Sequence, residues 1–319
     1  MLILDLRNGG RPVPPDAPEI RATVTAVGNF DGVHTGHRAI LARAVREAAA
    51  CGAEPAVWSF ARHPFADRIP LLTDSRDRLA LFANEGIRYA FLEDFSRVRM
   101  LSAEAFSKEI LSEQCRAVSV VCGPNFHCGK DGYADTAAFG EALAASGIPL
   151  HVVPMVFLAG EPVSSTRIRR LLAAGDAAGA AQCLGRPYSV SLPVLHGKQL
   201  GRTLGFPTVN QVFPAGMQYP LPGTYASAAV ADGKPYPAVT NVGVRPTVTE
   251  NDDHALNAET HIIGYSGDLY GKEVRIAFRC RLRDEKRFAS LDDLREQISR
   301  DIRTSVSDFS EKGVIFPCP

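Results

Sequence analysis

Two histidines near the amino end, His34 and His37, lie three positions apart in the polar stretch from Gly28 to His37. At that spacing both imidazoles lie on one face of the first turn of a helix. A helix amino terminus attracts anions, and Gly36 lets a ligand come close to the backbone. Two donors beside a helix dipole can stabilise charge on a phosphate while a second phosphate attacks it. The stretch therefore predicts a polyphosphate site for nucleotidyl transfer, although a short His-x-Gly-His sequence also occurs by accident in surface turns.

A second group of polar residues opens a helix further along the chain: Ser164, Ser165, Thr166 and Arg169. The hydroxyl groups can cap the helix or contact a phosphate, and the planar guanidinium of Arg169 suits a phosphate. Taken alone, an ordinary helix cap with a solvated arginine explains this segment better. The segment is a candidate phosphate site because of its position directly after a predicted strand.

The first half of the chain alternates between strand and helix patterns. Apolar, β-branched runs predict strands at 23–27, 56–60, 87–92, 117–122 and 150–156. Such alternation predicts a Rossmann-like parallel sheet with helices on both faces, which binds its ligands beyond the carboxyl ends of the strands. The segments 28–37, 123–132 and 164–169 each follow a predicted strand. We therefore expect these three segments to form one site.

The pattern changes near Gly185. Short strands separated by turn residues are predicted at 188–195, 224–230, 237–242, 258–265 and 273–280. Asp232-Gly233 is a hairpin signal, and the regular spacing predicts a small antiparallel β-barrel. A helix beginning at Ser290 ends the chain, with an apolar stripe of Leu291, Leu294 and Ile298. We expect two domains, residues 1–184 with the α/β fold and residues 185–319 with the barrel and the C-terminal helix.

The composition excludes several classes of protein. The 319 residues are 45% hydrophobic and 22% charged, the profile of a globular protein with two domains. Lys plus Arg and Asp plus Glu each number 35, so the zero net charge disfavours nucleic acid as a partner. The seven cysteines are odd in number and lack a CxxC, which is typical of reduced thiols. Because no run has the length of a signal peptide or a membrane span, we expect a cytoplasmic protein without membrane contact.

Together, the motifs of the first half resemble the nucleotidylyltransferase superfamily. More narrowly, the stretches 28–37 and 164–169 resemble the bacterial bifunctional riboflavin kinase/FAD synthetase family, with further matches at Ser59-Phe60, His63-Pro64, Leu72-Thr73 and Gly123-x-Asn125-Phe126. The resemblance implies a FAD synthetase site in which His34, His37 and Arg169 are catalytic. It implies that these residues bind the nucleotide or the second substrate: Gly28, Asn29, Phe30, Asp31, Gly36, Asn125, Ser164, Ser165 and Thr166.

The second half carries its own match, in the loop from Gly201 to Asn210. Gly205 permits a close backbone approach, and Pro207 stiffens the turn. Thr208 and Asn210 offer oxygen atoms that suit Mg²⁺ and phosphate. This loop resembles the loop of riboflavin kinases that ends in Pro-Thr-Ala-Asn.

Further segments match the riboflavin kinase pattern in order: 223–226, 241–247, 259–262, 268–271 and 282–288. The resemblance implies that Glu259 is the base that takes the proton from the ribityl 5′-hydroxyl. It also implies Thr208 and Asn210 as metal ligands, Gly205 as part of the nucleotide site and Arg283 beside the flavin. The chain departs from the family pattern at four positions: Leu192, Val209, Pro124 and Cys128.

We expect a bifunctional transferase that phosphorylates riboflavin to FMN and adenylylates FMN to FAD, using ATP and Mg²⁺ in both steps. The departures leave open a member with one degenerate domain and a single activity. A second alternative is a flavin or nucleotide sensor without turnover, which would need neither metal ligands nor a base. A third is an adenylyltransferase for another substrate, which the barrel disfavours. The expected partners are ATP, riboflavin and FMN, and weak self-association stays open.

Overall fold

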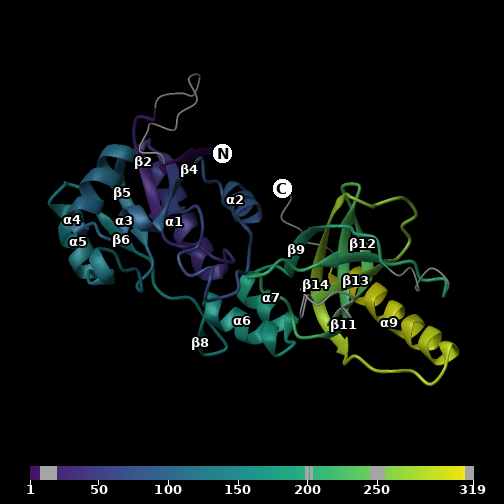
Figure 1. The fold of residues 1–319 in the computed structure, drawn as a ribbon. Coiled ribbons are helices and arrows are strands. Elements are labelled where there is room, and N and C mark those ends of the chain that lie inside the picture. Colours follow the sequence, from purple (N-terminus) through teal and green to yellow (C-terminus); the bar gives the residue numbers. More distant parts are fainter. Residues whose placement is uncertain (8–19, 198–200, 202–203, 245–255, 313–319) are drawn as a thin grey trace. The chain divides into compact units, whose positions relative to one another are not determined.

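The computed structural model describes residues 1–7, 20–197, 201, 204–244 and 256–312. The chain divides into two compact units, Met1–Ser165 and Thr166–Phe316, each with its own sheet (Figure 1). The boundary between the units falls at the start of one helix. As a statement about functional domains, the limits 1–184 and 185–319 stay a prediction.

The first unit is built on a six-stranded sheet in the order β1-β4-β3-β2-β5-β6, in which all neighbouring strands are parallel. Its strands are β1 (Leu2–Asp5), β2 (Thr23–Val27), β3 (Glu54–Phe60), β4 (Tyr89–Glu93), β5 (Ala117–Cys122) and β6 (Leu150–Val152). The predicted parallel sheet is confirmed. The edge strand β1 was not predicted, because a run of four residues is too short to show a period.

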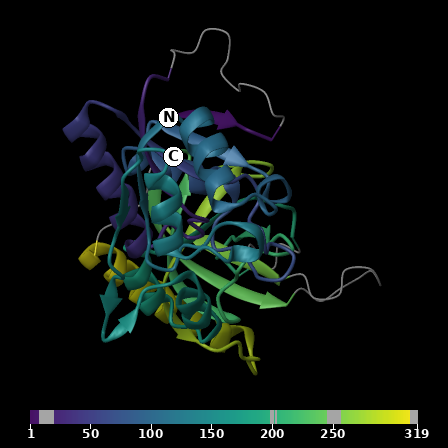
Figure 2. The same ribbon diagram turned by 90° about the vertical axis from the view of Figure 1, so that its left-hand side faces the viewer.

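Helices cover both faces of this sheet (Figure 1 and Figure 2). They are α1 (Thr35–Cys51), α2 (Ser75–Asn84), α3 (Phe95–Val98), α4 (Ala103–Ala105), a π-helix (Phe106–Gln114) and α5 (Thr136–Ala144). One apolar cluster joins α1 and α2 to the sheet through Leu41 and Phe82. The other cluster joins the π-helix and α5 to the opposite face, where Trp58, Phe106 and Phe139 are buried.

The strand order of the first unit reverses beside β2. From β2 the chain proceeds to β3 and β4 on one side, and it returns later to β5 and β6 on the other. The loops that leave the carboxyl ends of β2 and β5 therefore flank the position where the strand order reverses. Parallel sheets bind ligands at such a position.

From the sequence, Ser75 is the expected cap of helix α2, because a helical pattern with Leu79, Leu81 and Phe82 follows it. Asp74, not Ser75, caps the helix, with its Oδ1 accepting a hydrogen bond of 2.6 Å from the backbone N–H of Asp77. The Ser75 hydroxyl instead donates to the carbonyl of Ala61 at 3.2 Å. Because an Asp and a Ser stand side by side here, helix-capping preference alone did not distinguish between them.

The second unit begins with α6 (Ser165–Ala173) and α7 (Ala177–Leu184) and continues as an antiparallel sheet in the order β10-β13-β12-β11-β14-β9. The strands are β9 (Tyr188–Pro193), β10 (Val209–Val212), β11 (Gly223–Ala231), β12 (Lys234–Val244), β13 (Leu256–Ile262) and β14 (Glu273–Arg283). A bridge between Leu195 and Asn210 brings the two edge strands together, so the sheet curls toward a barrel. Asp232 and Gly233 form the predicted hairpin turn, and both have positive φ.

The C-terminal helix α9 (Leu291–Lys312) packs on the barrel through polar residues. Ser290 caps it as predicted, but Leu291 is 64% exposed, so the predicted apolar stripe is wrong at that residue. The buried face instead carries Asp301, Ser305 and Asp308. The reason lies in β14, because its arginines reach these carboxylates.

Two ion pairs and one hydrogen bond hold α9 on the barrel. Arg283 pairs with Asp301, and Arg279 pairs with Asp308. Both side chains of the second pair are at most 9% exposed. Between the ion pairs, the Ser305 hydroxyl donates to the carbonyl of Ala238 at 2.6 Å.

No helix in the described part of the chain combines the length and apolar character that a membrane span requires.

Replacing Asp308 with alanine should destabilise the second unit by about 3 kcal/mol, because it leaves the Arg279 guanidinium buried without its counter-charge. Differential scanning calorimetry of the full chain measures the effect. The control is Arg300→Ala, whose exposed pair with Glu296 contributes at most about 0.5 kcal/mol. Equal unfolding temperatures for the two variants would contradict a role for the buried pair.

Candidate functional site

The loop after β2 ends at His34, which caps α1 through its own side chain. The Nδ1 atom of His34 accepts a hydrogen bond of 3.2 Å from the backbone N–H of His37. The two imidazoles stack with their centroids 3.6 Å apart and their planes 16° from parallel. Because Nδ1 accepts here, a neutral His34 carries its proton on Nε2. The cap therefore supplies a defined donor at a helix amino terminus.

The absence of a side chain at Gly36 leaves room for the His34 ring. A Cβ atom at position 36 would lie 3.1 Å from Cε1 of His34, so a side chain there would displace the imidazole. Phe30 is buried, has φ 54° and meets the His37 ring edge-on at 5.3 Å. A Cβ atom at Gly28 would lie 3.2 Å from the Phe30 ring. Gly28, Phe30 and Gly36 therefore shape the positions of the two histidines.

Asp31, a residue of this loop, is buried. Its Oδ1 accepts hydrogen bonds from the backbone N–H groups of Leu72 at 3.0 Å and Thr73 at 3.2 Å. The Thr73 hydroxyl in turn accepts from the backbone N–H of Gly32 at 3.1 Å. These bonds fix the loop to the segment before α2, and they occupy the carboxylate that sequence reasoning assigned to substrate binding.

The third predicted segment meets the first one. The Ser165 hydroxyl donates to the carbonyl of Asp31 at 2.8 Å, so Ser165, the last residue of the first unit, is held at the loop after β2. Ser164 precedes it and is partly buried. Thr166, which is exposed, and Arg169, which is partly buried, follow within α6 and belong to the second unit.

Asn125 lies in the loop after β5 and is exposed. Its carbonyl is 3.1 Å from Nδ1 of His127, while Phe126 packs against Phe139 with centroids 5.0 Å apart. At the start of this loop, a Cβ atom on Gly123 would lie 3.3 Å from Ile40 of α1. The loop therefore leaves the sheet directly beside the helix that His34 caps.

A row of polar residues crosses the sheet of the second unit. Residues directly opposite one another in antiparallel strands lie on the same face. The register runs from β10 across β13, β12 and β11 to β14 through Asn210, Glu259, Asn241, Thr224 and Arg283. The structure thus brings three predicted residues, Asn210, Glu259 and Arg283, into one row. Thr208 lies two residues before Asn210, just ahead of β10.

Hydrogen bonds order the side chains around Glu259. Asn257, two residues earlier in β13, donates from Nδ2 to Oε1 of Glu259 at 3.2 Å. Asn241 accepts from the Thr224 hydroxyl at 3.2 Å and donates to Glu285 at 3.2 Å. Sequence reasoning missed Asn257 and gave Asn241 and Glu285 no role, because only the strand register and these hydrogen bonds show that Asn257 and Asn241 neighbour Glu259 and that Glu285 binds Asn241.

The loop before β10 carries close contacts that only glycine permits. A Cβ atom at Gly197 would lie 2.5 Å from Cγ of Asn210. Gly205 has φ +86° with open space around its Cα. The Pro207 carbonyl accepts a hydrogen bond of 2.8 Å from Nδ1 of His261. The chain is therefore held on both sides of Thr208.

Arg283 connects the end of β14 to α9. Its Nε and Nη2 lie 3.0 and 2.9 Å from Oδ2 of Asp301, and its guanidinium lies 5.6 Å from the centre of the Phe288 ring. The Nη1 atom donates to the Asp284 carbonyl at 3.3 Å. These contacts hold the segment after β14, so contact between Arg283 and the flavin stays a prediction.

The four departures from the family pattern differ in where they lie. Leu192 is buried in the barrel, and Val209 pairs with Thr260 on the face opposite to that of Asn210. Pro124 is exposed. Burial raises the pKa of the Cys128 thiol to about 12.

Among the described residues, no group of three or more His, Cys, Asp or Glu residues is arranged to hold a metal ion.

Comparison with known proteins assigns both halves. The FAD synthetase family model matches residues 16–167, and the riboflavin kinase family model matches residues 184–308. Relatives named bifunctional riboflavin kinase/FMN adenylyltransferase are 38% identical in Pseudomonas fluorescens, over 89% of this chain and 92% of that protein, and 35% identical in Escherichia coli K12, over 88% and 91%. The chain belongs to the bifunctional riboflavin kinase/FMN adenylyltransferase family.

The predicted fold class, family and enzyme class are thereby confirmed, and the chain is a transferase. The riboflavin kinase model covers the barrel and most of α9, and the FAD synthetase model covers most of the parallel sheet and its helices. A solved structure of a protein named macrolide-efflux protein, from Streptococcus pneumoniae, matches with a TM-score of 0.82 at 26% identity. It covers 96% of this chain and 99% of its own, so the same two folds follow one another there.

Gly197→Ala should lower the rate of riboflavin phosphorylation about ten- to a hundredfold, because the new methyl group displaces the Asn210 amide. Chromatography of the FMN formed from riboflavin and ATP measures the loss. FAD formation from supplied FMN is the internal control and should be unchanged. A variant with normal rates in both reactions would remove Asn210 from the kinase site.

Proposed function

We propose that residues 185–319 phosphorylate riboflavin with ATP to give FMN, and that residues 1–184 transfer AMP from ATP to FMN. The products of the second step are FAD and pyrophosphate. The observation that best supports the proposal is the register of β10 on β13, which puts Glu259 directly opposite Asn210. A base and a metal ligand side by side suit transfer of a phosphoryl group to a hydroxyl. A protein that only sensed flavins would need neither.

In the adenylylation step, a phosphate oxygen of FMN attacks the α-phosphorus of ATP. The bond from that phosphorus to the oxygen bridging to the β-phosphorus breaks, and pyrophosphate leaves. His34 and His37 stabilise the negative charge that develops, because their rings are stacked at the amino end of α1. Arg169 acts with them on the phosphates. The remaining contacts to the nucleotide and to FMN come from Asn125, Ser164, Ser165 and Thr166.

In the kinase step, Glu259 takes the proton of the ribityl 5′-hydroxyl while that oxygen attacks the γ-phosphorus of ATP. The bond from the γ-phosphorus to the bridging oxygen breaks, and ADP leaves. The hydrogen bond from Asn257 orients the carboxylate. It leaves the second carboxylate oxygen for the substrate.

Thr208 and Asn210 are the residues that would hold Mg²⁺ in the kinase site. Their hydroxyl and amide oxygens are donors of the kind that this hard cation prefers. When bound, Mg²⁺ neutralises charge on the transferred phosphate. Gly205 leaves the backbone before these ligands accessible to the nucleotide.

The substrates of the whole chain are ATP, riboflavin and FMN. We place the enzyme in the cytoplasm, where cysteines stay reduced, and the six described cysteines are all free thiols. Weak self-association is part of the same proposal. It is checked by sedimentation of the full chain at several concentrations.

His34→Ala and His37→Ala should each lower FAD formation by about a hundredfold or more, because each removes charge stabilisation at the transferred phosphate. Steady-state rates with supplied FMN measure the effect, and FMN formation from riboflavin should survive. His151→Ala, which changes a partly exposed histidine beside Glu47, is the matched control. A histidine variant that lost only the kinase step would refute the assignment.

Glu259→Gln should lower the turnover of riboflavin phosphorylation by about a hundred- to ten-thousandfold, because glutamine cannot take the hydroxyl proton. The Michaelis constants should change little, because the lost interaction forms in the transition state. Thr208→Ala, in contrast, should also weaken metal-dependent binding of ATP. Glu273→Gln, on the exposed first residue of β14, is the control. Normal FMN production by Glu259→Gln would make Glu259 a surface carboxylate without a catalytic role.

A further inference from the structure

A buried arginine that the proposed chemistry does not use lies at the carboxyl edge of the first sheet. Arg78, in α2, is only 4% exposed. Burial lowers the pKa of its guanidinium group, and the negative charge of Asp31 opposes that shift. Most helical arginines place their charge in water, since a buried charge is costly without partners. The position of Arg78 therefore calls for a functional or structural reason.

The partners of Arg78 are backbone carbonyls from two different strand ends. Its Nη1 donates to the carbonyl of Asn29, just after β2, at 3.1 Å. Its Nη2 donates to the carbonyls of Phe60, the last residue of β3, and of Ala61, the latter at 3.3 Å. The Asn29 carbonyl also accepts from the Ser59 hydroxyl at 3.3 Å. One guanidinium group thus ties the loop after β2 to the end of β3.

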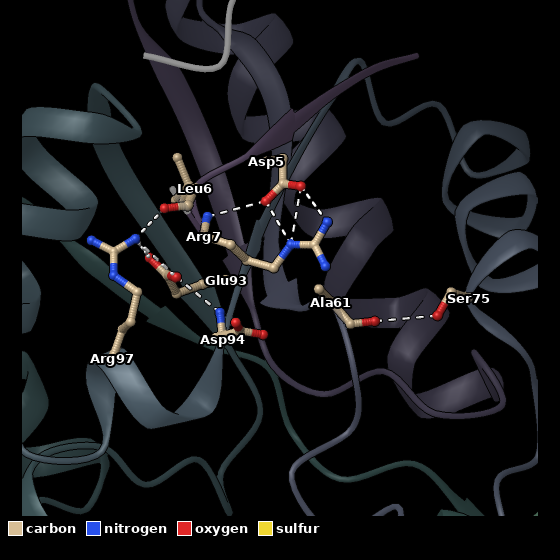
Figure 3. A network of polar contacts seen from close by, with 8 residues as sticks. All are labelled: Asp5, Leu6, Arg7, Ala61, Ser75, Glu93, Asp94 and Arg97. Atoms are coloured by element: carbon tan, nitrogen blue, oxygen red, sulfur yellow. Dashed lines mark hydrogen bonds and ion pairs between the residues drawn. The ribbon is translucent and has the colours of Figure 1, made fainter. Parts of the chain in front are cut away.

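A second arginine, Arg97 in α3, continues the same edge by binding residues at the ends of β1 and β4. The Ala61 N–H donates to the Glu93 carbonyl at 2.9 Å, and Arg97 binds both the Glu93 carboxylate and the carbonyl of Leu6. Figure 3 shows the contacts of Arg97 together with the bond from Ser75 to Ala61. The carboxyl ends of β1, β4, β3 and β2 are therefore linked in sequence, and Arg78 makes the link that reaches the loop of His34.

These carbonyls matter for phosphate chemistry. At the carboxyl edge of a parallel sheet the last carbonyl groups have no partner within the ladder, and each carries partial negative charge. Left unpaired, they would repel a polyphosphate or draw water into the site. Arg78 donates to three of them and adds a positive charge behind the loop that ends at His34.

We propose that Arg78 is a positioning residue for adenylyl transfer, which holds the loop from Gly28 to His34 so that the two stacked imidazoles meet the α-phosphate. The inference rests on the proposed role of His34. It assigns to Arg78 no contact with substrate. Asp31, within the same loop, accepts hydrogen bonds from Leu72 and Thr73, so two buried groups of opposite charge hold this loop.

The test is a double-mutant cycle in the full chain, with Arg78→Lys, His34→Ala and the double variant. Lysine keeps the charge but cannot reach carbonyls of both strand ends at once. Arg78→Lys should lower the turnover of FAD formation about a hundredfold, with the Michaelis constants for FMN and ATP nearly unchanged. In the His34→Ala background the same change should cost less than threefold, because the group that it positions is gone.

The controls separate position from stability. Riboflavin phosphorylation by the same variants should be normal. Arg88 directly precedes β4, is exposed and pairs with Glu54. Arg88→Lys should leave both reactions unchanged. If Arg78→Lys does not fold, Ser59→Ala removes a weaker bond to the same Asn29 carbonyl and should give a smaller, equally non-additive loss.

Each contrary outcome points to a different error. If Arg78→Lys forms FAD at the full rate while His34→Ala is inactive, the proposed role of Arg78 is overturned and that of His34 stands. Losses that multiply in the double variant would show that Arg78 acts independently of His34, and would also overturn it. Normal FAD formation by His34→Ala would instead remove the proposed adenylylation site.

Discussion

Backbone hydrogen bonding between strands decides which side chains meet in both units of this protein. In the parallel sheet it brings the loops after β2 and β5 to one edge, where α1 begins with His34. In the antiparallel sheet it sets the register that aligns Asn210, Glu259 and Asn241 across three strands. Neither site is local in sequence. A shift of β13 by one residue would turn Glu259 to the other face of the sheet.

The same constraint explains what could be read from the sequence. The strands Thr23–Val27 and Ala117–Cys122 were predicted to the residue, because their apolar, β-branched runs are strong and isolated. The family resemblance pointed to Glu259 and Asn210 as expected site residues, but it could not find Asn257, whose only distinction is its place beside the carboxylate. Arg78 was also missed, since an arginine in a helix looks solvated until the carbonyls around it are known.

Buried charge is used in a consistent way in both units. Arg78 binds backbone carbonyls, whereas Arg279 and Arg283 bind Asp308 and Asp301. Such groups contribute little net stability compared with apolar packing, but they tolerate few alternative arrangements. Arg78 in this way holds the loop that ends at His34, and Arg279 and Arg283 hold α9 on the barrel. The exposure of Leu291 follows from this arrangement, because α9 is held by its carboxylates and not by a continuous apolar stripe.

The chain contains a single tryptophan, Trp58, and it is buried in the first unit against Phe106, with ring centroids 4.9 Å apart. It lies in β3, two residues before the carbonyl of Phe60 that Arg78 binds. Indole fluorescence therefore arises from the parallel-sheet unit alone, whereas the barrel contributes only tyrosine emission. An emission spectrum excited at the red edge of tryptophan absorption consequently reports the environment of one strand in one half of the enzyme, without any engineered label.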